Sequence, residues 1–246
     1  MARERSGCDT SSMAAPGARP TAPSDPARPL RRWLQGCTAL FAVAVAVSAI
    51  EPRHPADWWL ENALAWAFVA VLLVTHRRFP FSRVSYTLLF AFLGLHELGA
   101  HYTYAEVPYK EWLPFLDVTE RNHYDRLVHF LFGFLCAYPI REVFVRLVRV
   151  RGFWSYYLPL DLTMSFSMLY ELVEWAAAVV FGGELGMAYL GTQGDVWDAH
   201  KDMALASLGA LLAMLVIAFV NRRRRVNDPD PDAPLGEVAL ARPKQS

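Results

Sequence analysis

Long apolar blocks joined by short polar connections restrict the fold of this chain more than any other feature. Six blocks are present, at residues 33–50, 58–75, 84–101, 121–140, 154–181 and 203–220. Most approach the length of about 20 residues that an α-helix needs to cross the hydrocarbon core of a bilayer. Lipid offers the backbone no hydrogen-bond partners, so such blocks form helices. The sequence therefore predicts an all-α, polytopic membrane helix bundle with about six transmembrane spans.

Composition predicts one membrane-embedded domain between two polar tails. Hydrophobic residues make up 54% of the 246 residues, and the mean hydropathy is +0.18. Residues 1–30 are rich in Ala, Pro, Arg and Ser, and residues 223–246 are polar, so neither segment can build a core. We expect disordered cytoplasmic tails over 1–30 and 223–246, and a six-span domain over 31–222. The zero formal net charge gives no indication of a nucleic-acid partner.

The distribution of lysine and arginine predicts the orientation of the spans. Arginines are concentrated before the first block and after the second, fourth and sixth blocks, whereas the opposite connections carry few. Cytoplasmic loops of membrane proteins are enriched in these residues. We therefore expect a multi-pass membrane protein with both termini in the cytoplasm. Block 33–50 also resembles a secretory signal, but its long leader favours a retained span.

Acidic residues and histidines inside the blocks gather at one depth. They lie toward the outer ends of four predicted spans: His96, Glu97 and His101; Asp125 and His129; Glu171 and Glu174; Asp198 and Asp202. If a helix opens near Asp125, then Asn122, Asp125 and His129 fall on one stripe. Ionisable groups in a membrane segment are costly, so they face protein partners or water. We expect a polar pocket that opens to the periplasmic face.

These residue types predict a site without thiols. Carboxylates and imidazoles suit Zn, Mn, Fe or Mg, and the candidate metal ligands are His96, Glu97, His101, His129, Glu171 and Asp198. The candidate catalytic residues are Asp125, His129, Glu171, Glu174, Asp198 and Asp202, acting as general acids or bases. A metal or Arg126 would stabilise an anion. His96 and His101 are spaced too widely for the zinc-protease pair, unless the helix breaks between them.

Four sequence motifs carry a family resemblance. They are His-Glu-Leu-Gly-Ala-His-Tyr-Thr-Tyr (96–104), Arg-Asn-His-Tyr-Asp-Arg-Leu-Val-His-Phe (121–130), Tyr-Glu-Leu-Val-Glu-Trp (170–175) and Gly-Thr-Gln-Gly-Asp-Val-Trp-Asp (191–198). On these motifs the chain resembles the YjdF-type family of uncharacterised bacterial inner-membrane proteins, over roughly residues 35–220. A weaker similarity, to VanZ-like membrane proteins, rests on Asp125, His129, Phe130, Glu171 and Asp198, whereas Arg126 and Asp202 depart from that pattern. Neither resemblance assigns a reaction.

Three classes of function agree with this sequence. The first is a metal-dependent hydrolase or transferase that acts on a lipid or an envelope precursor, with membrane lipids and a lipid-linked substrate as partners. The second is a proton-coupled transporter in which Glu171 and Glu174 titrate. The third is a structural membrane protein whose charges only hold helices together. A carrier would be favoured by an inverted repeat, and no convincing repeat is visible in the sequence.

Overall fold

The computed structural model describes residues 28–116 and 120–224, and within these ranges the chain is helical, without strands. The predicted disordered tails lie outside the described residues, apart from their innermost few. The helices are α1 (Arg28–Ser48), α2 (Pro55–His76), α3 (Arg83–Tyr102), α4 (Tyr109–Trp112), η1 (Pro114–Leu116), α5 (Tyr124–Val143), η2 (Phe144–Val148), α6 (Trp154–Phe181), α7 (Gly183–Leu190) and α8 (Asp198–Arg224). The prediction of an all-α fold is confirmed for this part of the chain.

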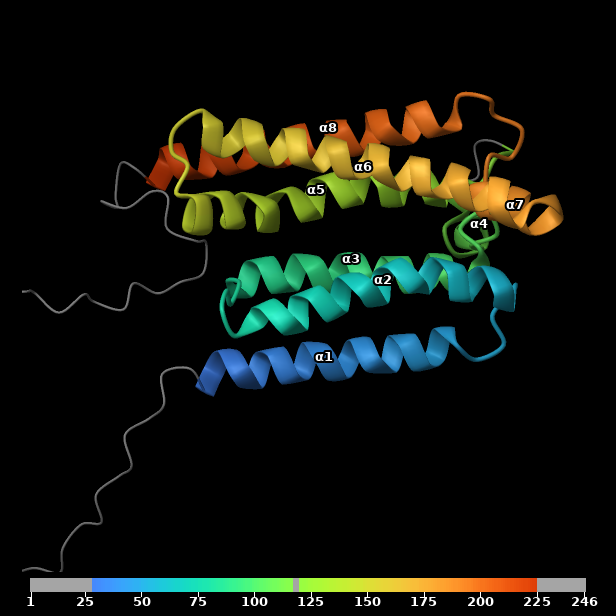
Figure 1. Cartoon of the computed structure of the whole chain (residues 1–246), viewed down its shortest axis with the longest axis horizontal. Helices are drawn as coiled ribbons and strands as arrows, with labels where there is room; N and C mark the ends of the chain where they lie inside the picture. Colours follow the sequence, from blue (N-terminus) through green and yellow to red (C-terminus); the bar gives the residue numbers. More distant parts are fainter. Residues whose placement is uncertain (1–27, 117–119, 225–246) are drawn as a thin grey trace, which may run out of the picture.

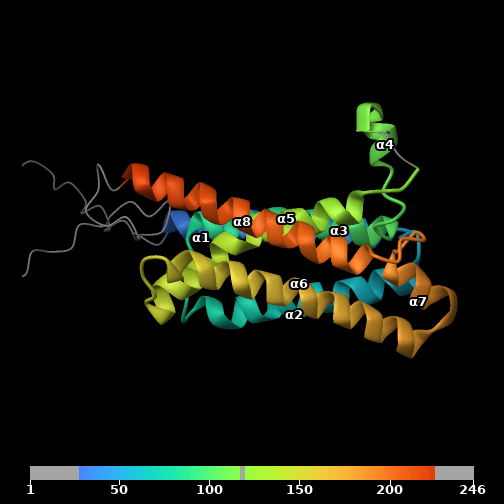
Figure 2. The ribbon, with the colours of Figure 1, turned by 90° about the horizontal axis from the view of Figure 1, so that it is seen from above.

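The long helices form two layers that run along a common direction (Figure 1). One layer holds α1, α2 and α3, and the other holds α5, α6 and α8, while α3 packs against α5 to join them. The start of α1 and the end of α8 lie at the same end of the bundle, and the short helices α4 and α7 lie at the other (Figure 1). Helix α4 projects away from the bundle (Figure 2).

Four of the described helices are long and apolar enough to cross a membrane. They are α2, α5 together with η2, α6 and α8. Helices α1 and α3 cover the two remaining blocks that the sequence predicts as spans, but they do not reach the same combination of length and hydropathy. The structure therefore supports an integral membrane protein with four candidate spans, and the full set of six stays a prediction.

The tightest helix contact is between α5 and α8. A Cβ atom added at Gly133 would collide with the carbonyl oxygen of Ala206, and one added at Gly209 would collide with that of Phe130. Small residues allow two helix backbones to approach this closely, as is common in membrane bundles. The contact holds the first turns of α5 and α8 beside each other, and these turns carry the acidic residues described below.

Two helix starts differ from our expectation and change which residues share a face. Helix α5 begins at Tyr124, so Asn122 lies outside it, where its Oδ1 accepts a hydrogen bond from the Tyr124 backbone N–H at 3.0 Å. Helix α8 begins at Asp198, five residues before the expected Met203, so Asp202 lies one turn into the helix. The unexpected helix α7 and a turn with positive φ at Gly191 and Gly194 connect α6 to α8.

Candidate functional site

The centre of the candidate site is a group of donor atoms on three helices, which we call the central cluster: Asp125 and His129 of α5, Glu171 of α6 and Asp202 of α8. His129 Nε2 lies 3.6 Å from Asp125 Oδ1 and 3.5 Å from Glu171 Oε1. Donor atoms of Asp125, His129 and Asp202 all lie within 4.8 Å of one another. Asp125 and His129 are one turn apart, so α5 presents both on the same face.

The central cluster leaves buried oxygen atoms without a partner. Asp202 is only 2% exposed, and its Oδ1 has no hydrogen-bond partner among the described residues. The same holds for Oε1 of Glu171, which faces the His129 ring without a hydrogen bond. A buried carboxylate is expensive unless it is paired, protonated or bound to a metal. One divalent ion with bonds of about 2.0–2.2 Å holds its donors within roughly 4.4 Å of each other, so a small closure would complete such a site.

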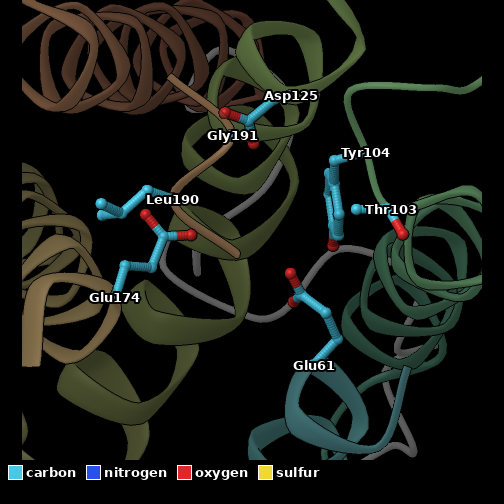
Figure 3. Close-up of a pocket in the computed structure, with 7 residues that line it drawn as sticks. All are labelled: Glu61, Thr103, Tyr104, Asp125, Glu174, Leu190 and Gly191. Atoms are coloured by element: carbon cyan, nitrogen blue, oxygen red, sulfur yellow. The ribbon is translucent and has the colours of Figure 1, made fainter. Parts of the chain in front are cut away.

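A small cavity adjoins the central cluster and shares Asp125 with it. Its volume is about 10 Å³, close to what one water molecule needs. The lining residues are Glu61, Thr103, Tyr104, Asp125, Glu174, Leu190 and Gly191. Figure 3 shows the carboxyl groups of Glu61, Asp125 and Glu174 and the phenol of Tyr104 around this space. Helices α2, α5 and α6 thus each contribute an acid to one cavity.

Hydrogen bonds extend from the cavity into the surrounding helices. The Tyr104 hydroxyl lies 2.6 Å from Nδ1 of His96, and the Tyr170 hydroxyl donates to Oε2 of Glu61 at 3.1 Å. Burial raises the pKa of the Tyr104 hydroxyl well above its ordinary value, so this group stays protonated. The phenol is therefore a fixed neutral polar group beside the acids.

The position of Tyr104 depends on the chain turn that follows α3. Thr103 and Tyr104 both have positive φ, 57° and 36°, which reverses the chain after the helix. The ring of Tyr104 then lies over Gly99, where any Cβ would collide with the ring atoms. The glycine of the His-Glu-Leu-Gly-Ala-His run thus has a steric role, because it lets the phenol reach back to His96.

Five charged residues form an ion-pair network beside the central cluster, at or near the N-termini of α5 and α8: Arg121, Arg126, Asp195, Asp198 and Lys201. Arg121 Nη2 donates to both Asp198 oxygens at 2.5 and 2.6 Å. Arg126 Nη2 donates to Asp195 at 2.5 Å and to Asp198 at 3.0 Å. The hydrogen bond from Lys201 lowers the pKa of Asp195 well below its ordinary value, and Arg126 adds to this effect. Asp198 is thus held by arginines.

Four of the six predicted metal ligands lie outside the central cluster: Asp198 in the ion-pair network, and His96, Glu97 and His101 on α3. Glu97 Oε2 accepts a hydrogen bond from the Ser48 hydroxyl at 2.5 Å, and His101 Nδ1 lies 2.9 Å from the Ser48 carbonyl oxygen. These contacts connect α3 to the end of α1. His96 points to a different neighbour, Tyr104. Because α3 turns these residues in different directions, they do not form one metal site among the described residues, and only His129 and Glu171 of the predicted metal ligands join the central cluster.

Sequence reasoning missed the acids of α2. Asp57 and Glu61 are one turn apart near the N-terminus of α2, and both are buried. The sequence-based prediction for this block was a membrane span without a site residue. Glu61 nevertheless carries the signal that marks the acids of the other spans, because it too is an acid near the outer end of an apolar block.

Comparisons with known proteins place this architecture in a family. A family model described as "predicted membrane protein (DUF2238)" matches residues 33–223. The inner membrane protein YjdF of Escherichia coli (strain K12) is 36% identical over 203 residues, which cover 80% of this chain and 95% of that protein. No solved structure matches the chain. The resemblance to the YjdF-type family is confirmed, whereas the similarity to VanZ-like proteins stays a prediction. The chain belongs to the DUF2238 family of membrane proteins.

Proposed function

We propose that this protein is a divalent-metal-dependent enzyme of the bacterial inner membrane, and that it catalyses hydrolysis or group transfer on a lipid or an envelope precursor. The observation that carries the proposal is the central cluster. Asp125, His129 and Asp202 converge from two helices, and a buried oxygen of Asp202 has no partner among the described residues. Structural contacts normally satisfy buried acids, so oxygens left in this state favour a bound cation.

The proposed membrane arrangement has six spans over residues 31–222 and both termini in the cytoplasm. The arginine distribution supports this topology, and so does the position of the described ends of α1 and α8 at one end of the bundle (Figure 1). The name of the relative YjdF supports the inner membrane as the location. In this arrangement the central cluster lies in the periplasmic half of the bundle.

The proposed roles follow from the contacts of each residue. Asp125, His129 and Asp202 would hold the ion with Glu171 beside them, and a bound ion would supply a nucleophilic hydroxide or polarise the substrate. Glu174 is 8% exposed and borders the cavity beside them, so we assign it to the acidic groups of the reactive site. Arg121 and Arg126 would bind a negative group of the substrate, with Asp198 aligning both guanidinium groups.

Metal analysis of the purified protein tests the proposal. We expect metal to co-purify in near-stoichiometric amount, and we expect Asp202→Asn and His129→Ala each to lose it. Glu97→Gln is the matched control, because Glu97 is an equally buried acid whose hydrogen bond from Ser48 a glutamine oxygen can accept. Wild-type metal content in both cluster variants would refute the metal site. Lipid profiling of a deletion strain would then identify the class of molecule that accumulates.

One observation favours the transporter as a second candidate. The side chains of Glu171 and Glu174 are hydrogen-bonded to each other, which requires a shared proton when no metal is bound. A carrier that uses this pair would move its substrate in response to a proton gradient. Reconstitution into proteoliposomes distinguishes the two, since a carrier responds to an imposed pH gradient and an enzyme converts its substrate without one.

A further inference from the structure

The acids around the central cluster outnumber what one divalent ion can neutralise. Five largely buried carboxyl groups meet here: Glu61, Asp125, Glu171, Glu174 and Asp202. The arginines beside them, Arg121 and Arg126, are held by Asp198 and Asp195. With all five acids ionised, one divalent cation would leave a net charge of about −3 in a low-dielectric environment, which is expensive.

We infer that the cavity between α2, α5 and α6 is a second divalent-cation site, and that Asp125 bridges the two ions. This inference rests on the proposed metal function and extends it. Asp125 both belongs to the central cluster and lines the cavity. Its two carboxylate oxygens can each bind one ion, as bridging carboxylates do in two-metal sites with ions about 3.5–4 Å apart.

The geometry of the cavity fits a cation. Glu61 and Glu174 face it from two other helices, so three carboxyl groups on three helices converge on one space (Figure 3). Helix bundles that hold two metal ions use the same device, inward-facing acids on facing helices. The cavity of about 10 Å³ accommodates an object the size of one water molecule, and a small divalent ion is no larger.

A second observation, independent of the acid count, also indicates missing cations. Oxygens of Glu171 and Asp202 are buried without partners among the described residues, and the hydrogen-bond partner of Glu174 is another carboxyl group. The acid Glu142 at the opposite end of the bundle does receive donors, whereas these oxygens, like Oε1 of Glu97 and both oxygens of Asp57, have none among the described residues. On the cluster side of Asp125, Glu171 and Asp202 thus each have an oxygen without a partner, and on the cavity side the partner of Glu174 is another acid.

The two sites differ in the chemistry of their donors. The central cluster includes the imidazole of His129, which suits Zn, Mn or Fe. The cavity offers only oxygen, from carboxyl groups and the protonated phenol of Tyr104. All-oxygen sites suit hard ions such as Mg²⁺ and Mn²⁺. We therefore infer a hard divalent ion in the cavity, beside an ion of more borderline character.

Manganese is the probe that reports on both sites. The purified full-length protein would be loaded with Mn²⁺ in detergent, freed of excess ion and analysed for metal per chain. We expect about two ions in the wild type, about one in Glu61→Gln and Glu174→Gln, and about two in the control Glu97→Gln. Electron paramagnetic resonance should show exchange coupling between the two ions in the wild type and an isolated Mn²⁺ signal in Glu61→Gln.

The outcomes separate this inference from the proposed function. No bound manganese in the wild type would overturn both. One ion in the wild type would overturn the second site and leave the metal-dependent function standing. Two ions in Glu61→Gln and in Glu174→Gln would place the second ion elsewhere and overturn its assignment to the cavity. The wild-type stoichiometry and coupling decide the question even if a cavity variant fails to fold.

Discussion

The two ends of the bundle treat buried acids in opposite ways. At the end where α3 begins, Glu142 accepts hydrogen bonds from the Ser82 backbone N–H and hydroxyl, each at 2.8 Å, and is paired with Arg146. At the other end, the acids of the central cluster and the cavity face other acids, and several oxygens have no partner among the described residues. The same residue type thus holds helices together at one end and forms a candidate site at the other.

This contrast shows how a structural acid differs from a functional one. Glu142 is surrounded by donors, including those at the N-terminus of α3, where a negative charge is favourable. Arg141, in the same region, donates to Ser155 and lies 4.6 Å from the ring centre of Tyr156. The oxygens of Glu142 are thus satisfied within the fold, although Nε of Arg141 is buried without a hydrogen-bond partner among the described residues. The cluster acids are satisfied only if something else binds to them.

The largest expected effect is on stability, from a substitution at Glu142. Glu142→Ala should lower the free energy of unfolding by about 3–5 kcal/mol, because it leaves Arg146 and the donors of Ser82 without their acceptor. Metal content should stay at the wild-type value. Thermal unfolding in detergent measures the stability, and elemental analysis measures the metal content. Loss of metal with unchanged stability would reverse the assignment of the two ends.

A substitution at the α5–α8 contact should lower both the stability of the fold and the affinity for metal. Gly133→Ala should cost about 2 kcal/mol, because its Cβ would push against the Ala206 carbonyl oxygen. The same displacement moves α5 relative to α8, so we also expect weaker metal affinity although Gly133 binds nothing. Metal titration of this variant and of Gly94→Ala, whose Cβ would meet open space, tests this. Equal affinities would show that the helix contact does not set the site.

Removing an acid of the central cluster should change the free energy of unfolding in the opposite direction from removing Glu142. In metal-free buffer, Asp202→Asn should raise the free energy of unfolding by about 1 kcal/mol, because one buried acid among others is replaced by a neutral amide. Addition of the metal should then stabilise the wild type and not the variant. Unfolding curves with and without chelator measure both. A destabilised metal-free variant would mean that Asp202 is a structural residue.

The smallest effect concerns the ion-pair network. The pKa of Asp195 is lowered in the folded protein, so its contribution to stability is present above its ordinary pKa of about 3.9 and is lost as pH falls toward the folded value. The difference in melting temperature between wild type and Asp195→Asn should therefore be small and constant from about pH 7 to 5, and should shrink below about pH 4. A difference that grows with acid would contradict this assignment.

The sequence predicts the helices well because apolar blocks in lipid have one backbone solution. The predicted fifth block coincides with α6, and the second and third blocks differ from α2 and α3 by a few residues at most. The predicted sixth block starts later than α8, because the prediction follows hydropathy and Asp198 and Asp202 lower it. Helix α7 is not predicted, because it is short and its glycines indicate only turns.

The residues of the candidate site are harder to predict, because depth along a span does not give the direction of a side chain. Depth groups Asp125, His129, Glu171 and Asp202, whose side chains lie close together in the structure. It also groups them with Glu97 and His101, which face α1 instead. At the end of the bundle where α3 begins, the structure adds the buried Glu142, which lies just beyond the predicted fourth block. Rotation about each helix axis depends on packing between helices, which a single sequence does not reveal.

The turn after α3 has a consequence for anyone comparing relatives of this protein. The run from His96 to His101 invites alignment by its histidines, yet its glycine is under the stricter steric demand, since the aromatic plane of Tyr104 occupies the space of a methyl group at Gly99. A homologue that keeps the histidines but carries a larger residue there would have to swing its tyrosine out of the cavity. Such a chain would retain the helix bundle but lose the phenol that lines the cavity.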